Sequence, residues 1–477
     1  MLDLLSVFRI KRFSTTFLLF LTILTGGFAQ EDKITLTEQK DYYQYDQDYL
    51  PASFHNARRD SLRSLMPSNS AFVVFASPQR KRSNDVYYEY HQDPNFYYLS
   101  GLREPNAMLI IYKDVKNFGD FSTDEILFIQ ERNPSSELWN GRRLGVEKAI
   151  ENLSIDVILR NIDFMDFDAK FDSLRAMFFE KPFALENKNT LTSDNITGLY
   201  SAFESKNTVK MKPKQEIGGI MMAQLRQVKT PEEIKLLRKA ILITCEAQNQ
   251  LMREIDLDMS EYQTEAIIEY VFKKNGAEYP GFPSIQGSGE NSCILHYTSN
   301  RRPLINGGLL VSDVGAEYHG YTADVTRTIP PSGKFTKEQK QIYELVLKAQ
   351  SAGIEAAQVG MSFWHPGKVA TEIISDGLMK LGIIEESYEV KNYFMHGTSH
   401  YLGLDVHDAG IYTPLEAGNV ITVEPGIYIA EDSECNPKWW NIGVRIEDDI
   451  LITKNGPENL SISSPRTVND IEVMMQK

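Results

Sequence analysis

Cysteine is scarce in this sequence, which contains only Cys245, Cys293 and Cys435 among its 477 residues. An odd count of three cannot form a complete disulfide framework, so the fold must be stabilised by a packed core. A chain of this length is too long for one ordinary core and is expected to form two domains. Hydrophobic residues at 42% and charged residues at 24% are typical of globular proteins, which excludes a disordered chain and a polytopic membrane protein.

Clustered positive charge is also lacking. The formal net charge is -15 at pH 7, and no stripe of Lys and Arg runs along the chain. Binding to a phosphate backbone needs such clusters, so nucleic acid is not expected as a partner.

The apolar run near the N-terminus is well short of the roughly 20 residues that span a bilayer. It covers 17–24, follows three basic residues at 9–12 and precedes the Gly-Phe-Ala segment 27–29. This pattern is typical of a secretory signal peptide. We therefore expect 1–29 to be cleaved off and the mature protein to be exported, periplasmic or secreted, with no stable membrane insertion. Retention of this segment as an anchor is the alternative.

The rest of the chain divides into a lead-in and two domains. Residues 30–50 are polar and tyrosine-rich and are expected to form an extended lead-in. From 51 to 222, short apolar runs alternate with helix-like stretches, which predicts an α/β N-terminal domain. Those apolar runs are 71–75, 107–112 and 125–129.

The second domain, residues 223–477, has a helix signal near its start. Thr230 is a good N-cap, Pro231 suits the first helical position, and the two glutamates that follow favour the positive end of a helix. Helices are also expected at about 260–275, 337–357 and 366–382, and strands at 308–313, 321–329, 420–429 and 442–453. Helices interleaved with mainly antiparallel strands predict an α+β domain.

Two aspartates occupy positions inside these expected strands. Asp313 and Asp324 would lie on the two strands of a hairpin whose connection is 316–320. A charge flanked by apolar strand residues is costly to bury unless it is paired or binds a metal. The alternative is that both aspartates lie at a strand edge and face solvent. For an isolated pair of aspartates, this alternative is the better prediction.

Histidines are concentrated in one segment. His396, His400 and His407 lie within twelve residues, although the whole chain has only eight histidines. A single histidine among apolar neighbours is usually a satisfied core residue, but three this close together are more often metal ligands or proton carriers.

Two further acidic positions follow this segment. Glu424 ends an apolar strand, and alternation along the next strand puts Arg445 and Glu447 on the same face. A salt bridge would explain Arg445 and Glu447 alone. It would not explain why five separate segments each end an apolar strand or loop with one potential metal ligand.

The ordered series of these residues resembles the pita-bread metallopeptidases, which include methionine aminopeptidase, prolidase and aminopeptidase P. The series consists of 294–297, Asp313, Asp324, the His400 segment, Glu424 and Glu447. The closest resemblance is to aminopeptidase P, through 394–403 and 445–449, and it extends to the accessory-domain segments 93–101 and 138–145. It covers about residues 50–470. The resemblance implies an α+β pita-bread catalytic domain preceded by an α/β creatinase-like N-terminal domain.

A site for two divalent metals is implied by this resemblance. Asp313 would chelate one metal, His400 and Glu424 the other, and Asp324 and Glu447 would bridge both. A site of mostly oxygen ligands with one imidazole suits manganese, with iron, cobalt or zinc as alternatives. A hydroxide bridging the two metals would be the nucleophile.

The resemblance also implies roles for the residues around the metals. Glu424 would relay the proton of the attacking water. His296, His396 and His407 would orient the scissile carbonyl and stabilise the charge that develops on the tetrahedral intermediate. Arg445 would hold the carboxylate ligands in place.

The implied activity is that of an aminopeptidase that removes an N-terminal residue lying before a proline. Prolidase, which cleaves Xaa-Pro dipeptides, is the alternative, although it commonly has proline at the position of Met395. Methionine aminopeptidase is disfavoured because it lacks a large N-terminal domain of this kind. A non-catalytic binding protein on the same fold is a third reading, but relatives of that type lose the metal ligands that this chain keeps.

The resemblance finally implies a homo-oligomer. In the family, the accessory domain packs against neighbouring subunits and can bring an aromatic residue to the mouth of another subunit's site. Trp139 matches that position, in an expected loop, with packing inside its own domain as the alternative.

Overall fold

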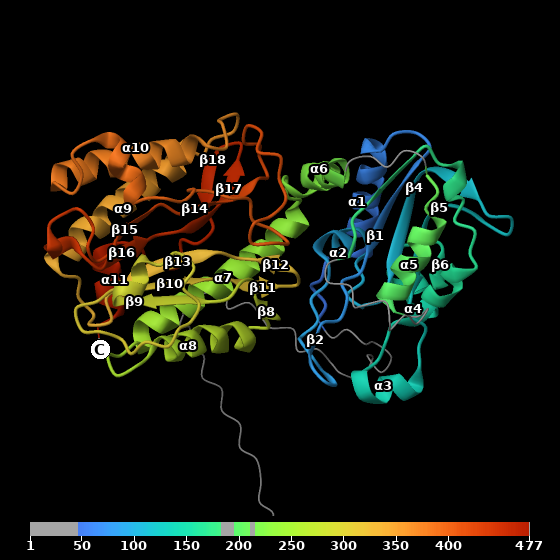
Figure 1. The fold of residues 1–477 in the computed structure, drawn as a ribbon, viewed down its shortest axis with the longest axis horizontal. Helices are drawn as coiled ribbons and strands as arrows, with labels where there is room; N and C mark the ends of the chain where they lie inside the picture. Colours follow the sequence, from blue (N-terminus) through green and yellow to red (C-terminus); the bar gives the residue numbers. More distant parts are fainter. Residues whose placement is uncertain (1–45, 183–194, 210–214, 477) are drawn as a thin grey trace, which may run out of the picture. The chain divides into compact units, whose positions relative to one another are not determined.

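The computed structural model describes residues 46–182, 195–209 and 215–476 (Figure 1). The expected signal peptide at 1–29 and most of the lead-in at 30–50 lie outside the described residues and remain predictions. The expected domain boundary between 222 and 223 also remains a prediction, and helix α6 (Gln215–Arg226) runs through it.

A five-stranded sheet with the order β6-β5-β4-β1-β7 forms the centre of the N-terminal part. The three central strands are antiparallel to one another, and the two outer strands are parallel to their neighbours. The sheet strands are β1 (Ser70–Phe75), β4 (Met108–Asn117), β5 (Ser122–Ile129), β6 (Ile158–Arg160) and β7 (Ala176–Phe179), and a separate hairpin comprises β2 (Lys81–Ser83) and β3 (Val86–Tyr87). The helices are α1 (Ala52–Leu65), α2 (Pro94–Ser100), α3 (Pro134–Asn140), α4 (Gly145–Asn152), α5 (Ile196–Lys206), α6, and the 3-10 helices η1 (Asn161–Met165) and η2 (Phe171–Ser173).

Helices cover both faces of this sheet. Because side chains alternate along a strand, Val73 and Phe75 of β1 pack in one core with Phe203 of α5. The intervening Phe72 faces the opposite way and packs against Gly218 of α6. Figure 1 shows α1 and α6 on one side of β1 and α5 on the other. The α/β architecture predicted for this domain is confirmed.

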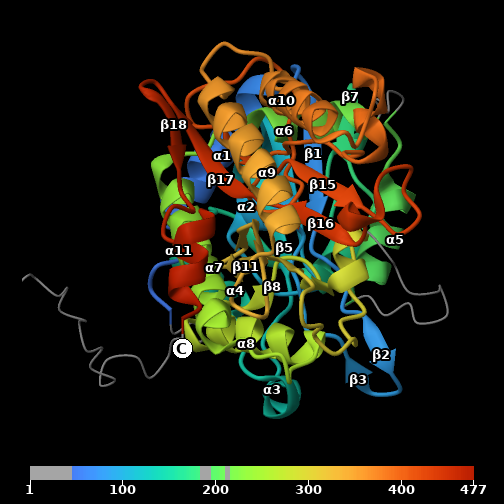
Figure 2. The same cartoon turned by 90° about the vertical axis from the view of Figure 1, so that its left-hand side faces the viewer.

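The C-terminal part places antiparallel strands between two pairs of helices, α7 with α8 and α9 with α10 (Figures 1 and 2). Its helices are α7 (Pro231–Glu254), α8 (Glu261–Lys274), α9 (Lys337–Ala356), α10 (His365–Leu381), α11 (Val468–Met474), η4 (Gly289–Cys293), η5 (Ser387–Asn392) and η6 (Pro437–Trp439). Its strands are β8 (Tyr279–Pro280), β9 (Ile285–Ser288), β10 (Leu310–Val314), β11 (Ala316–Tyr318), β12 (Tyr321–Thr322), β13 (Val325–Ile329), β14 (Val420–Val423), β15 (Gly426–Ile429), β16 (Ile442–Arg445), β17 (Asp448–Thr453) and β18 (Gly456–Asn459). The predicted α+β composition is confirmed.

The predicted start of α7 is confirmed in detail. The Thr230 side chain accepts a hydrogen bond from the Glu233 backbone N–H, and the Glu233 carboxylate accepts one from the Thr230 backbone N–H. This capping box satisfies two backbone donors that a helix start would otherwise leave unpaired. In the described part of the chain, no helix combines the length and the apolar character needed to cross a membrane.

Three expected strands are interrupted in the structure. The segment 321–329 divides into β12 and β13, 420–429 into β14 and β15, and 442–453 into β16 and β17. The acidic residues Asp324, Glu424 and Glu447 lie in the three breaks, so the prediction that Asp324 sits inside a strand is wrong. At a break the chain exchanges one partner for another, since β14 pairs with β17 whereas β15 pairs with β16.

The expected connection at 316–320 is also wrong, because most of it is strand β11, which pairs with β12. The chain changes direction at Gly315, where its backbone passes close to that of Ala323. A Cβ atom at Gly315 would lie 1.7 Å from the Ala323 carbonyl oxygen, so only glycine fits at this point. The chain leaves β10 there, forms the short β11–β12 hairpin, and returns as β13 beside β10.

Candidate metal centre and active site

The five residues expected to bind metal come from the ends and breaks of strands, and from one loop. They are Asp313 on β10, Asp324 before β13, His400 after η5, Glu424 after β14 and Glu447 before β17. The His400 loop is joined to β14, because the Thr422 backbone N–H donates to the His400 carbonyl at 3.0 Å. Backbone pairing therefore brings residues distant in sequence into one place.

The side chain of His400 lies among carboxylates. Its Nε2 atom is 3.4 Å from Oδ2 of Asp324 and 3.5 Å from Oε1 of Glu424. One ligand atom each of Asp324, His400 and Glu447 lie within 4.8 Å of one another. The other ring nitrogen, Nδ1, is 3.1 Å from the Tyr401 carbonyl oxygen, to which it can only donate. This contact leaves the Nε2 lone pair directed at the carboxylates, as a metal-binding imidazole requires.

Several buried carboxylate oxygens here have no hydrogen-bond partner among the described residues. They are Oδ1 of Asp313, Oδ1 of Asp324 and Oε1 of Glu447. Folded proteins pair nearly all buried polar atoms, so three orphaned oxygens at one place need another partner. Carboxylate oxygens are the preferred ligands of hard divalent cations, and four carboxylates balance the charge of two such ions. The residues present therefore fit the implied pair of metals.

The close packing of buried carboxylates also raises their pKa values. Burial, with Asp313 as the next contributor, raises the pKa of Asp324 well above its usual range. Burial and the neighbouring Asp324 raise the pKa of Glu447 in the same way. Burial raises the pKa of Glu424 to about 7. Without cations, these carboxylates therefore disfavour the charged state and oppose folding.

We expect Asp324→Asn to stabilise the metal-free protein, because it removes one of the mutually repelling charges at constant size. The expected gain is about 0.5–2 kcal/mol in the free energy of unfolding. Denaturant unfolding of chelated protein measures it best at pH 8, above the Glu424 pKa of about 7, where repulsion is largest. Metal-loaded wild type should remain the most stable form. A chelated Asp324→Asn protein less stable than chelated wild type would contradict this electrostatic account.

Three further histidines surround the cluster in a cavity of about 360 Å³. Its lining consists of Leu295, His296, Asp313, His396, Gly397, Ser399, His400, His407, Tyr412, Glu424 and Arg445. Burial lowers the pKa of His396 to about 4, and the Arg445 charge adds to this effect. Burial, with His400 next, also lowers the pKa of His407. Both imidazoles are therefore neutral near pH 7. The one N–H of His396 is at Nδ1, which donates to the Gly397 carbonyl at 2.7 Å.

Arg445 connects three parts of the site. Its Nη2 donates to Oδ2 of Asp313 at 2.6 Å and to the Leu295 carbonyl at 3.3 Å, next to His296. Its Nη1 donates to the Tyr428 hydroxyl at 2.9 Å. The carboxylate partner of Arg445 is therefore Asp313, so the salt bridge with Glu447 considered above does not form. Asp313 and the His296 loop are held by the same guanidinium.

Three residues of the site were not among those expected from the sequence, namely Thr326, Tyr412 and Tyr428. The Tyr428 hydroxyl lies 2.8 Å from Nε2 of His396, in addition to its contact with Arg445. Thr326 Oγ1 donates to Oε2 of Glu447 at 2.6 Å. Tyr412 lines the cavity with a positive φ of 51°. A tyrosine between two isoleucines in a buried strand was the available signal for Tyr428; Thr326 and Tyr412 have no such signal.

Comparison with known proteins identifies two domain families in this chain. Residues 235–454 match metallopeptidase family M24, and residues 55–174 match the aminopeptidase P N-terminal domain. The Xaa-Pro aminopeptidase of Haemophilus influenzae is 37% identical over 89% of this chain and 98% of that protein.

Solved structures give the same result. Escherichia coli aminopeptidase P with the inhibitor Pro-Leu superposes with a TM-score of 0.79 at 34% identity, covering 90% of this chain and 98% of that one. The zinc-substituted E. coli enzyme in complex with product has a TM-score of 0.79 at 35% identity, with the same coverage. The chain therefore belongs to metallopeptidase family M24, has the pita-bread fold that its sequence predicts, and is an aminopeptidase of the aminopeptidase P group.

Proposed function

We propose that this aminopeptidase hydrolyses the bond between an N-terminal residue and a following proline. The observation that carries the proposal is the cluster of buried carboxylates with unpaired oxygens, beside a cavity lined by histidines. Relatives named Xaa-Pro aminopeptidase, matched over nearly their whole length, support the choice of substrate.

Two divalent cations, with manganese as our choice, are proposed as the cofactor. Asp313, Asp324, His400, Glu424 and Glu447 would hold them, with Asp324 and Glu447 as the ligands shared by both. A zinc-substituted relative supports a divalent ion at this kind of site. When bound, such a pair acidifies a water molecule and polarises a carbonyl.

The protein's own side chains complete the reaction. Glu424 lines the cavity beside the cluster and would take a proton from the attacking water and pass it to the proline nitrogen as the bond breaks. The neutral His407, with His296, donates hydrogen bonds to the carbonyl oxygen as negative charge develops on it. His396 lines the same cavity, but its N–H donates to the Gly397 carbonyl and its Nε2 faces the Tyr428 hydroxyl. Arg445 keeps Asp313 oriented and neutralises part of the negative charge.

A panel of short peptides tests this function. With the manganese-loaded protein, we expect release of the first residue from Xaa-Pro-Xaa tripeptides, little release from Xaa-Ala-Xaa, and none after chelation. Hydrolysis confined to Xaa-Pro dipeptides would favour prolidase. A protein that neither binds metal nor cleaves any of these peptides would favour a binding protein on the same fold.

We also propose that the mature chain is exported. The support is the signal-like pattern of 1–29, which lies outside the described residues. N-terminal sequencing of protein from the extracytoplasmic fraction should begin at Gln30. A cytoplasmic protein that starts at Met1 would contradict the proposal, and a membrane-bound one would favour the retained anchor.

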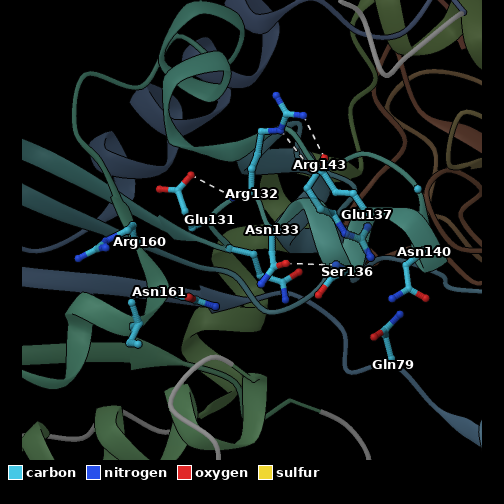
Figure 3. A pocket seen from close by; sticks show the side chains of 13 residues that line it. Gln79, Glu131, Arg132, Asn133, Ser136, Glu137, Asn140, Arg143, Arg160 and Asn161 are labelled. Atoms are coloured by element: carbon cyan, nitrogen blue, oxygen red, sulfur yellow. Dashed lines mark hydrogen bonds and ion pairs between the residues drawn. The ribbon is translucent and has the colours of Figure 1, made fainter.

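We also propose that the protein forms a homo-oligomer. Two exposed apolar side chains on α3 support this proposal. Leu138 and Trp139 on this helix are 86% and 87% exposed. The helix itself is well anchored, since Asn133 accepts hydrogen bonds from Ser135 and Ser136, and Glu137 pairs with Arg132 at 3.0 Å (Figure 3). It borders a polar cavity of about 460 Å³. Trp139 thus lies on a short helix rather than in the expected loop, and packing inside its own domain is excluded.

We expect Trp139→Ala to weaken the binding of tripeptides and longer substrates, because the indole would reach the site of a neighbouring subunit. KM should rise more than kcat falls, and metal content should stay constant. Tyr388→Ala, which removes an aromatic residue that is 66% exposed on η5, is the control and should leave KM unchanged. A strictly monomeric protein, or unchanged kinetics at every peptide length, would rule out this role.

A further inference from the structure

A group of four charged side chains, three of them buried, joins the loop that carries His407 to the segment between α6 and α7. Arg226 ends α6, Lys229 precedes α7, and Asp405 and Asp408 belong to the loop that carries His407. The side chains of Arg226, Lys229 and Asp408 are 4%, 1% and 1% exposed, whereas that of Asp405 is 48% exposed. Two cations and two anions balance, so the group is neutral as a whole.

The contacts within this group are direct. Arg226 Nη2 donates to Oδ2 of Asp405 at 2.8 Å and also to Oδ1 of Asp408. Lys229 Nζ donates to Oδ2 of Asp408 at 2.6 Å. Burial acts to raise the pKa of Asp408, but Arg226 and Lys229 outweigh it and hold that pKa below its usual range. Asp408 is therefore a carboxylate that depends on both cations.

The two aspartates stand on either side of His407, two residues before it and one after it. The His407 ring lies against the ring of His400, with centroids 4.4 Å apart. A Cβ at Gly403, at the start of the loop, would lie 2.2 Å from Oδ2 of Asp408, so the loop is folded tightly around this carboxylate. Arg226 thus binds the loop at two points that bracket the imidazole.

Arg226 also reaches the N-terminal part of the chain. Its Nη1 donates to Oδ1 of Asn95 on α2 at 2.8 Å, and the Tyr98 hydroxyl donates to the Leu225 carbonyl at 3.0 Å. One guanidinium therefore contacts α2 and the catalytic loop at the same time. Replacing Arg226 therefore removes its hydrogen bonds to α2 and to the catalytic loop together.

We propose that Arg226 is a positioning residue for His407, which it holds against the His400 ring by binding Asp405 and Asp408. The proposal rests on the role assigned to His407 under the proposed function. A general stabilising role would affect kcat whether or not His407 is present. A positioning role affects kcat only through the His407 imidazole.

A double-mutant cycle tests this proposal in the manganese-loaded full chain. Arg226→Met should lower kcat about 10- to 100-fold when His407 is present, with metal content unchanged. In a His407→Ala background the same replacement should change kcat less than about twofold, because nothing remains to be positioned. Arg226→Lys should recover part of the loss. Asp405→Asn, at a half-exposed site, is the milder variant if Arg226→Met does not fold.

Arg59→Met is the matched control for a buried arginine. Arg59 is fully buried and pairs with Glu125 at 2.8 Å in the N-terminal part, away from the His407 loop. Its replacement should lower the melting temperature but affect kcat equally in both backgrounds. Equal losses for Arg226→Met in both backgrounds would overturn the proposal. If His407→Ala itself leaves kcat unchanged, His407 has no role in the reaction. In that case the positioning role of Arg226 is also ruled out.

Discussion

Alanine at Asp324 or at Glu447 is expected to abolish turnover, with kcat/KM falling on the order of 10⁴-fold or more. Each carboxylate is buried, carries one oxygen without a hydrogen-bond partner, and lies within reach of the His400 imidazole. A carboxylate that contacts both cations, as proposed for Asp324 and Glu447, cannot be lost without changing the spacing or the number of bound ions. Neither alanine nor a water in its place restores the lost negative charge.

Metal content separates this effect from a loss of folding. Elemental analysis should show less than two divalent ions per chain in both variants, while their circular dichroism stays native. Glu125→Gln is the matched control, because Glu125 is also a buried carboxylate but pairs with Arg59 far from the cluster. It should lose stability and keep both metals and kcat. Asp324→Ala or Glu447→Ala protein with two bound metals and near wild-type turnover would show that the ligand assignment is wrong.

Local sequence signals were sufficient for the four long helices of the catalytic domain, but not for α11 or the 3-10 helices. The Thr230-Pro231 signal predicted the first residue of α7, since capping depends on neighbouring residues only. The helices expected at 260–275, 337–357 and 366–382 agree with α8, α9 and α10 to within a residue or so at each end. Their apolar stripes were enough because α8 and α9 each pack one face on the strands and α10 packs one face on α9.

The strand breaks could not be predicted in the same way. Strand-forming residues lie on both sides of Asp324, and apolar residues occur before Glu447 and again from Ile450 onward, so the local pattern predicts one long strand in each case. The breaks exist because the two halves of each segment pair with different partner strands, and a local pattern does not show which strand will be the partner. Pro425 directly after Glu424 was the one local signal, because proline has no N–H to donate to a ladder.

Contacts between distant charges were equally hidden. Alternation put Arg445 beside Glu447, but its guanidinium binds Asp313, which is 132 residues away in sequence. No local pattern around Arg226 indicates a role for this arginine. Its partner Asp408 lies 182 residues later, so the contact is visible only in the fold. The order of ligand types along the chain indicated a metal site, whereas the residues that hold those ligands in place became visible only with the fold.

His407→Ala is expected to lower kcat by about 10²–10³-fold, less than the loss of a bridging carboxylate. The imidazole lines the cavity and is kept neutral by burial, which lowers its pKa, with the neighbouring His400 contributing. A neutral ring donates one hydrogen bond to the carbonyl oxygen, and this bond strengthens as the oxygen becomes anionic. Its loss therefore raises the barrier more than it weakens substrate binding, so kcat falls while KM changes little.

Metal content should remain at two ions in the His407→Ala protein, because His407 is outside the proposed ligand set. His407→Gln keeps a side-chain donor and should recover part of the lost rate. His365→Ala removes a histidine at the start of α10, outside the cavity, and is the control whose kcat should equal that of wild type. A His407→Ala protein that loses metal would make His407 a ligand, and one with an unchanged kcat would exclude it from the reaction.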